Sequence, residues 1–399
     1  MKQLLFVDDE VKVIDGLRRM LRPLRDEWAM EFTTSGREAL ALLATRPFDV
    51  IVTDMRMPEM DGAQLLDVVR MRFPKMVRIV LTGQCNRESV LRLLAVAHRH
   101  LTMPCDADTL KSAIARTCAL RDLLNNPVLL GMISQMRSVP SLPALYMEVN
   151  RELETKDFSL DKVGQIIGRD VGMTAKIMQV VNSASFGLRG RAADPAQALK
   201  LLGSETTKIL VLAANVFTQI DPAVLKAVAI NLIWEHCRQS SKLAALICQA
   251  ENASPLVAQL ASMAGMLQDT GRLILATHHT AGYVEAMRLC QRGQSLSDAE
   301  RQVFGATHAE VGAYLLGLWG LPEPIVEVIA WHHCPNRCPA TSFGPLTAVH
   351  AANALLEPSA EGPVGATELD VLYLERLALA SRLDAWRSLA RAMDRGHVA

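Results

Sequence analysis

The chain has 399 residues, which is more than one ordinary hydrophobic core organises, so two or three domains are expected. Its 42 lysines and arginines equal its 42 aspartates and glutamates, and this zero net charge gives no support for non-specific nucleic-acid binding. Hydrophobic residues make up 50% of the chain against 21% for charged residues, which excludes a disordered protein.

Targeting signals are not evident. No apolar run approaches the roughly 18 residues that a membrane-spanning helix needs. The start, MKQLLFVDDE, turns acidic too early for a signal peptide. The eight cysteines are scattered, as reduced thiols are in cytosolic proteins. We therefore expect a soluble cytoplasmic protein.

Residues 1–122 alternate between short apolar runs typical of strands and amphipathic stretches typical of helices. Strands are expected at 4–7, 30–33, 50–53, 77–81 and 100–102. Helices are expected at 11–21, 37–44, 62–72, 87–97 and 106–124, with Asp61-Gly62 and Asp106 at helix starts. Five successive β-α units predict a parallel sheet covered on both faces.

Three acidic residues follow directly on two of these strands. Asp8 and Asp9 come after the first strand, and Asp54 comes after the third. The carboxyl ends of parallel strands meet at one edge of the sheet, so one crevice should receive all three carboxylates. Crowded carboxylates raise one another's pKa unless a cation lies among them, and Mg²⁺ suits an all-oxygen site. The pattern predicts metal-dependent phosphoryl chemistry on a carboxylate.

Four short motifs accompany these aspartates in a fixed order. They are Met57-Pro58, Asp61-Gly62, Leu81-Thr82-Gly83 and Thr102-Met103-Pro104. Together the residues resemble the receiver domain of two-component response regulators, and the resemblance spans the whole of 1–122. It implies a flavodoxin-like (βα)5 fold.

The resemblance also implies a role for each matching residue. Asp54 would be the phosphoacceptor, a carboxylate nucleophile that takes a phosphoryl group from a histidine kinase or phosphotransfer protein. Thr82 and His100 would be switch residues that respond to the new charge. The implied Mg²⁺ ligands are Asp8, Asp9, Asp54 and the backbone carbonyl of Arg56.

One position departs from the receiver pattern. Met103 stands where the family has a lysine that contacts the phosphate. A hydrogen bond to a charged group contributes roughly 1.5–3 kcal/mol, so its loss should weaken phosphorylation or its readout. Either Asp54 is still phosphorylated, with Arg56 supplying some positive charge, or the receiver acts through protein contacts alone. The intact acids and Thr82 favour phosphorylation.

A helical linker is expected at 123–137. Asn125-Asn126-Pro127 interrupts the preceding helix, because a residue before proline disfavours the α conformation, and a short helical run to 136 follows. From 138 to 355 strand signals vanish and helical spacing dominates, which predicts an all-α bundle. Its helices are expected at 145–153, 160–168, 172–182, 195–202, 206–216, 223–250, 256–267, 309–319 and 324–331.

The 138–355 module resembles an HDOD domain. The matching residues include Leu142-Pro143, Asn182-Ser183-Ala184-Ser185-Phe186-Gly187, Trp234-Glu235-His236 and His332-His333. HDOD domains are related to the HD phosphohydrolases, which include cyclic-dinucleotide phosphodiesterases, but they generally lack the complete metal set. The resemblance therefore implies an HD-type helical fold that serves as an output module.

The metal set of the hydrolases is incomplete in this chain. The positions that keep a ligand-type residue are His236, Asp269, His308, His332 and His333. Gln268 stands in place of a histidine and Asn353 in place of an aspartate, and amides are weak ligands for transition metals. The Gly-Tyr-Pro signature of the dinucleotide phosphodiesterases is also missing. We therefore expect a non-catalytic, protein-binding domain without a cofactor.

Several alternatives stay open for the surviving histidines. They could be hydrogen-bonded core residues, or they could hold a residual metal, with Cys334 and Cys338 nearby as additional zinc ligands. An HD-type metal-dependent phosphohydrolase under receiver control is the alternative function. Nucleotide binding without hydrolysis is a weaker one.

The tail, 356–399, is expected to be a helical extension. Thr367 and Asp370 resemble a capping box that opens a helix near Glu368. The apolar residues that follow recur at helical spacing, so a final helix pair should pack on the bundle while its arginines sit in water. A basic partner-binding helix is the alternative.

The chain as a whole is predicted to be a response regulator of a two-component phosphorelay. Phosphorylation of Asp54 would control an HDOD output that binds a downstream signalling protein. No helix-turn-helix with a basic recognition face is evident, so no DNA partner is expected. Family receivers often dimerise through the side around His100, which leaves a homodimer open.

Overall fold

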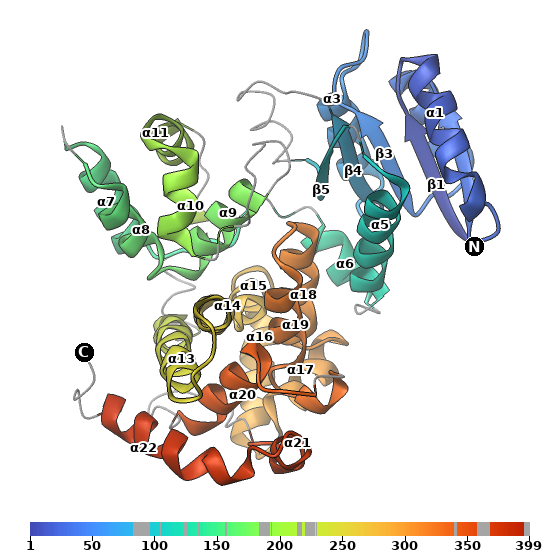
Figure 1. Ribbon diagram of the computed structural model, residues 1–399. Coiled ribbons are helices and arrows are strands. Elements are labelled where there is room, and N and C mark those ends of the chain that lie inside the picture. Colours follow the sequence, from blue (N-terminus) through green and yellow to red (C-terminus); the bar gives the residue numbers. More distant parts are fainter. Residues whose placement is uncertain are drawn as a thin grey trace. The chain divides into compact units, whose positions relative to one another are not determined.

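The computed structural model describes residues 1–82, 96–103, 105–122, 126–134, 136, 138–155, 158–182, 192, 194–213, 218–219, 228, 230–338, 341–356 and 368–394. Gly83, Pro104, the 183–187 motif, Thr367 and nearly all of the helix expected at 87–97 lie outside these residues. The chain divides into two compact units (Figure 1). The first consists mainly of Met1–Arg137, and the second of Ser138–Gln179, Arg191–Leu316 and Leu321–Ala399.

Five parallel strands form the sheet of the first unit. They are β1 (Lys2–Val7), β2 (Trp28–Thr33), β3 (Val50–Asp54), β4 (Val77–Thr82) and β5 (Arg99–Thr102), in the order β2-β1-β3-β4-β5. The described helices around it are α1 (Val11–Leu21), α2 (Gly36–Thr45), α3 (Gly62–Arg72) and α5 (Ala107–Asp122), with a 3₁₀ turn at Arg22–Leu24. Each strand expected from the sequence is present, and the predicted α/β fold is confirmed.

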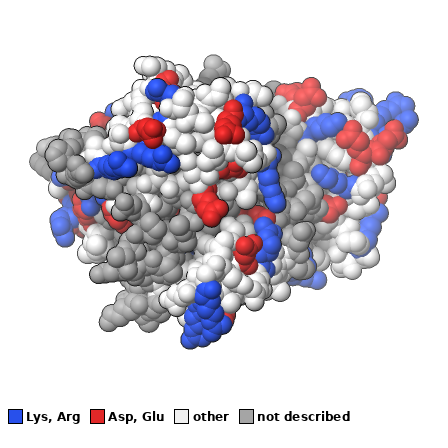
Figure 2. Space-filling model, turned by 90° about the horizontal axis from the view of Figure 1, so that it is seen from below, with Lys and Arg blue, Asp and Glu red and all other residues white. Residues whose placement is uncertain are grey.

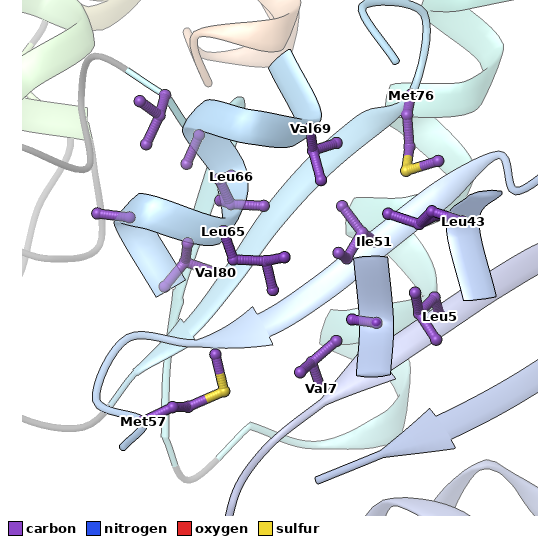
Figure 3. Close-up of a cluster of buried hydrophobic side chains, with 14 of the residues drawn as sticks. Leu5, Val7, Leu43, Ile51, Met57, Leu65, Leu66, Val69, Met76 and Val80 are labelled. Atoms are coloured by element: carbon purple, nitrogen blue, oxygen red, sulfur yellow. The ribbon is translucent and has the colours of Figure 1, made fainter. Parts of the chain in front are cut away.

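Alternate side chains of each strand feed two hydrophobic cores, one on each face of the sheet. Leu5 and Val7 of β1 point into the core that α2 and α3 close, which Figure 3 shows. Leu4 and Phe6 point into the opposite core, which α1 and α5 close. Because both faces are covered, the strands read as nearly continuous apolar runs.

The linker helix α6 (Pro127–Ile133) begins where the sequence predicts a break. Asn126 is its N-cap, since Asn126 Oδ1 accepts the N–H groups of Val128 at 2.9 Å and Leu129 at 3.3 Å. Pro127 occupies the first helical position, where a missing N–H costs nothing. The helix ends at Ile133 and not at 136 as expected from the sequence.

The second unit is helical almost throughout. Its helices to residue 355 are α7 (Pro143–Leu153), α8 (Leu160–Ile167), α9 (Val171–Asn182), α10 (Pro195–Leu202), α11 (Ser204–Ala213), α13 (Ile230–Ala250), α14 (Pro255–Leu267), α15 (Thr270–His278), α16 (Thr280–Gln291), α17 (Leu296–Phe304), α18 (His308–Leu318), α19 (Glu323–Trp331) and α20 (Pro345–Leu355), with a 3₁₀ turn at Pro335–Arg337. The expectation of no strands was wrong in one detail, because β6 (Pro140–Ser141) and β7 (Thr218–Gln219) form a short parallel pair. Among the described residues, no helix is both long and apolar enough to cross a membrane.

Four helices of this unit were not expected from the sequence: α15, α16, α17 and α20. Two of these helices are buried on all sides over most of their length, from 270 to 276 in α15 and from 346 to 353 in α20. Their sequences therefore show no amphipathic period. Burial all round is decided by the neighbouring helices, which a local pattern does not reveal.

The tail packs on the bundle as α21 (Val371–Arg376), a 3₁₀ turn at Ala380–Arg382 and α22 (Leu383–Asp394). The helix begins at Val371, with Asp370 as its N-cap, and not near Glu368 as predicted. Trp386 is fully buried and its Nε1–H donates to Glu251 Oε1 at 2.8 Å. Arg382 donates to the same oxygen at 2.8 Å, so this arginine is tied to the bundle while 42% of its side chain stays exposed to water.

Candidate functional sites

The carboxyl ends of β1 and β3 lie side by side at one edge of the parallel sheet. Val7 of β1 is paired with Thr53 of β3, so Asp8 and Asp54 follow at neighbouring positions. From β1 the chain continues outward to β2 on one side, and β3 and β4 lie on the other. Such a reversal of strand order opens a crevice beyond the strand ends, which is the usual ligand site of this architecture.

The carboxylates at this edge carry raised pKa values. Burial, together with the charges of Asp54 and Asp9, raises the pKa of Asp8 to about 6, and the N–H of Glu10 opposes this rise. Burial also raises the pKa of Asp54, although the backbone N–H of Arg56 donates to its Oδ2 at 2.6 Å. A cation among these groups would stabilise their ionised forms.

The donor set at this edge fits Mg²⁺. Carboxylate and carbonyl oxygens are the ligands of this hard cation, and it tolerates waters in the rest of its shell. The residues that would hold it are Asp8, Asp9, Asp54 and the backbone carbonyl of Arg56, as predicted from the sequence. The raised pKa of Asp8 is the observation that favours a cation here.

The loop after Asp54 is closed tightly by Gly62. The Gly62 N–H donates to the Met55 carbonyl at 2.9 Å, and a Cβ at position 62 would lie 2.1 Å from the Asp54 carbonyl oxygen. Asp61 forms a capping box with Gln64 at the start of α3. The backbone that carries Asp54 is therefore tied to the first turn of a helix.

The predicted switch residues lie on the next two strands. Thr82 ends β4 and is paired with Thr102 of β5, while His100 is paired with Val80. Thr82 therefore lies one position beyond Leu81, the partner of Asp54 in the register. Met103 follows β5 and is 36% exposed. By the resemblance to receiver domains, its thioether occupies the position of the family's lysine.

In the second unit, side chains from four helical regions, that of Asp269 among them, meet in one buried cluster. His236 comes from α13, Asp269 from the junction of α14 and α15, and His308 from the start of α18. His332 and His333 follow α19. His236 Nε2 and His308 Nε2 lie 3.7 and 3.4 Å from the two carboxylate oxygens of Asp269. The structure thus brings together residues that the sequence separates widely.

Three imidazoles form one half of this cluster. The side-chain nitrogens of His308, His332 and His333 lie within 4.8 Å of one another. His308 Nδ1 is 2.7 Å from Glu300 Oε2, and His332 Nδ1 is 2.9 Å from the Ile329 carbonyl, so both Nε2 atoms face the cluster. Among the described residues His332 Nε2 is buried without a hydrogen-bond partner. A hydrogen bond at Nδ1 that fixes the ring and directs Nε2 into a site is typical of metal-binding histidines.

Amides occupy the other half of the cluster. His236 Nε2 is 2.6 Å from Asn353 Oδ1, which makes it a donor and removes its lone pair from metal binding. Gln268 Nε2 donates to Ser240 Oγ at 2.9 Å and lies 3.4 Å from Asn353 Oδ1. This half is a hydrogen-bond network at the positions where the resemblance to HD hydrolases implied metal ligands.

Two family models match the chain. The response regulator receiver domain matches residues 4–115, and the HDOD domain matches residues 139–335. The chain joins a receiver domain to an HDOD domain. The resemblance inferred from the sequence is confirmed, as is the predicted fold class.

Individual relatives match parts of this arrangement. An uncharacterized protein of Treponema pallidum is 26% identical over 211 residues, which are 51% of this chain and 39% of that protein. The hydrogenase transcriptional regulatory protein HoxA of Cupriavidus necator is 41% identical over 87 residues, 22% of this chain and 17% of that protein. The chain thus spans well under half the length of these relatives.

Solved structures also match parts of the chain. The signal receiver domain of an HD domain-containing protein from Pseudomonas fluorescens is 27% identical, covers 30% of this chain and 97% of that chain, and has a TM-score of 0.29. The MmoQ response regulator of Methylococcus capsulatus is 22% identical, covers 63% of this chain and 98% of that chain, and has a TM-score of 0.46.

Sequence reasoning missed several buried residues of the HDOD cluster. Arg272 NH1 lies 3.7 Å from Asp269 Oδ2, and Arg272 Nε donates to the Tyr283 hydroxyl at 3.3 Å. Burial opposes ionisation of Asp269, but Arg272, His236 and His308 outweigh it and hold its pKa below its usual range. Only the i, i+3 spacing of Asp269 and Arg272 on one helix face hinted at this pair.

Proposed function

We propose that the receiver domain accepts a phosphoryl group on Asp54 and that the HDOD domain passes the signal on by binding protein, without catalysis. The observation that supports the first part most directly is the pair of half-buried carboxylates, Asp8 and Asp54, at the strand-order reversal. The observation that supports the second part is the amide network of Gln268 and Asn353.

The chemistry at Asp54 is a transfer between two nucleophiles. A carboxylate oxygen of Asp54 attacks the phosphorus of a phosphohistidine in a histidine kinase or phosphotransfer protein, the P–N bond breaks, and an aspartyl phosphate forms. Asp8 and Asp9 would provide the negative charge that holds Mg²⁺, and a bound ion would offset charge on the phosphoryl oxygens. The N–H of Arg56 keeps the Asp54 side chain in place.

Asp54→Asn tests the phosphoacceptor. The full chain is incubated with Mg²⁺ and acetyl phosphate, and its intact mass is measured. We expect wild type to gain one phosphoryl group that hydroxylamine removes, and Asp54→Asn to gain none, because an amide is not a nucleophile here. Asp67→Asn, at a half-exposed carboxylate on α3 that is paired with Arg70, is the matched control and should behave as wild type. An unmodified wild type would support a receiver that works through protein contacts alone.

The charge distribution agrees with a protein partner. On the face that Figure 2 displays, Lys and Arg are interspersed with Asp and Glu over the described residues. A DNA-binding surface would collect one sign of charge along a groove-sized stripe. A downstream signalling protein is therefore the proposed partner of the HDOD domain, and a second copy of the chain is a further candidate.

A metal-dependent phosphohydrolase is the second candidate, and a specific observation favours it. The imidazoles of His308, His332 and His333 converge beside Asp269, a donor set that suits one transition-metal ion. His236 is tied to Asn353, so a second ion would lack its ligands. One ion could polarise a phosphate, but a binuclear hydrolase centre needs two.

Metal content separates the two candidates. The dialysed full chain is analysed by elemental mass spectrometry, with His332→Ala as the site variant and the exposed His278→Ala as the control. We expect a chain free of transition metals. Near-stoichiometric iron, manganese or zinc that is lost in His332→Ala alone would contradict the non-catalytic proposal. Gln268→His combined with Asn353→Asp should add metal binding, because it restores an imidazole and a carboxylate to the amide half.

A further inference from the structure

A concave surface lies at the edge of the receiver sheet opposite to Asp8 and Asp54. It has a volume of ≈1030 Å³ and is lined by residues 43–49, by residues 72–76 and by Leu130 of α6. The first two segments lead into the amino ends of β3 and β4. We call this surface the basic groove. Nothing in the phosphoacceptor chemistry requires it.

The two loops present the same pair of side chains. The Arg46 guanidinium lies over the Phe48 ring at 5.2 Å, and that of Arg72 lies over the Phe73 ring at 5.7 Å. In each pair the cation is attracted by the negative face of the ring. The lining of the groove therefore combines apolar rings with guanidinium groups.

Some of the basic residues that line the groove have no acidic partner among the described residues. Arg46 is paired with Glu31 at 2.8 Å. Arg72 and Lys75 are exposed, and no carboxylate of the described residues forms an ion pair with either. Asp49, the acidic residue of the lining, accepts the backbone N–H of Gln3 at 2.9 Å. Two cations at one side are thus available to a ligand.

The linker helix α6 is held in place as a wall of the groove. Arg78 of β4 is 1% exposed, and its NH2 donates to the Ser134 carbonyl, at the end of α6, at 2.6 Å. The same guanidinium donates through Nε to the Val96 carbonyl at 2.7 Å and contacts His98 Nε2. A methyl group on Gly131 would lie 3.9 Å from Pro74 Cγ, so α6 passes against the 72–76 loop.

We propose that the basic groove is a docking site for an acidic segment of a partner protein that carries a large apolar side chain. Carboxylates of the segment pair with Arg72 and Lys75, and its apolar side chain fills the space between Phe48 and Leu130. A nucleic acid fits less well, because the rings of Phe48 and Phe73 already carry a guanidinium on one face and bases need aromatic faces for stacking.

The test measures binding of a defined probe to the full chain by fluorescence anisotropy. The probe is a fluorescein-labelled peptide of sequence EDLFDEL, compared with KKLFKKL. Arg72→Glu combined with Lys75→Glu should weaken EDLFDEL binding about tenfold or more, because two attractive rim charges become repulsive. Arg19→Glu combined with Arg22→Glu, exposed cations elsewhere on the receiver, should leave it unchanged.

A second variant tests the apolar part. Leu130→Ala should weaken EDLFDEL binding severalfold without altering the charge. The proposal is overturned if EDLFDEL shows no saturable binding at millimolar concentration, if KKLFKKL binds as tightly, or if neither variant changes the affinity. It is also overturned if an oligothymidylate binds more tightly than the peptide and loses its affinity in the charge variant. Because the assay needs no phosphorylation, its failure is independent of Asp54.

Discussion

The Asp8 carboxyl group lies half-buried in the field of Asp9 and Asp54. Its pKa of about 6 is higher than the value of 3.8 for an unfolded aspartate. The folded state therefore holds the Asp8 proton more tightly than the unfolded state does. The contribution of this group to the free energy of unfolding is fully present below pH 3.8, and it is lost as the pH rises through 6. The metal-free receiver is therefore expected to lose stability over this window, and a bound cation to restore it.

Mg²⁺ affinity should depend on pH for the same reason. Below about pH 6 a proton on Asp8 competes with the ion, so affinity should fall up to about tenfold per pH unit as the solution is acidified. Calorimetric titration of the full chain at pH 5, 6 and 7 measures this. Asp8→Asn should bind more weakly and with less pH dependence. Equal wild-type affinity at pH 5 and 7 would show that Asp8 is not a ligand.

Met103 and Gln268 are two residues at which the chain departs from the patterns inferred for receiver domains and HD hydrolases. Met103 places a thioether near the switch strands, where it can neither pair with a phosphate nor replace a cation. Gln268 fills a buried position with an amide that donates to Ser240. In both cases one side chain changes what the site can bind while the surrounding fold keeps its form.

The helix α22 is stabilised by one large side chain. Trp386 is fully buried, and its indole shares Glu251 Oε1 with Arg382. The six residues of α21 form less than two turns, so propensity alone does not keep this tail folded. Its order depends on packing against α13, with which α22 is in contact.

Trp386→Ala should destabilise the tail strongly. Truncation of a buried tryptophan costs about 3–5 kcal/mol, and Trp386→Phe should cost less because it removes mainly the hydrogen bond. Hydrogen exchange of residues 383–394 in the full chain reports the local free energy of opening. Leu372→Ala, at a residue 74% exposed on α21, is the control and should change little. Unaltered protection in Trp386→Ala would mean that α22 is held by other contacts.

The whole molecule has two separate sets of cores. The receiver builds one on each face of its sheet, and the HDOD unit buries apolar side chains between its own helices, among them Leu267, Leu273 and Val349. Since each compact unit has its own hydrophobic core, the two can unfold as separate cooperative units.

Thermal unfolding should therefore show two transitions, and Mg²⁺ should raise only one of them. A ligand stabilises the unit that binds it by mass action, so the receiver transition moves up with Mg²⁺ concentration while the HDOD transition stays in place. Differential scanning calorimetry of the full chain measures both. Asp54→Asn identifies the receiver transition, whose response to Mg²⁺ should be reduced. A single transition, or an equal shift of both, would contradict this prediction.

Local patterns in the sequence determined the parallel sheet, the helix starts at Asp61 and Asp106, and the acidic edge with Asp8 and Asp54. These features depend on strand periodicity, capping and strand order, which short stretches of chain encode. The tertiary structure alone decided that His236 pairs with Asn353 while His308 faces Asp269. Those contacts join helices far apart in the chain, and no local period records them.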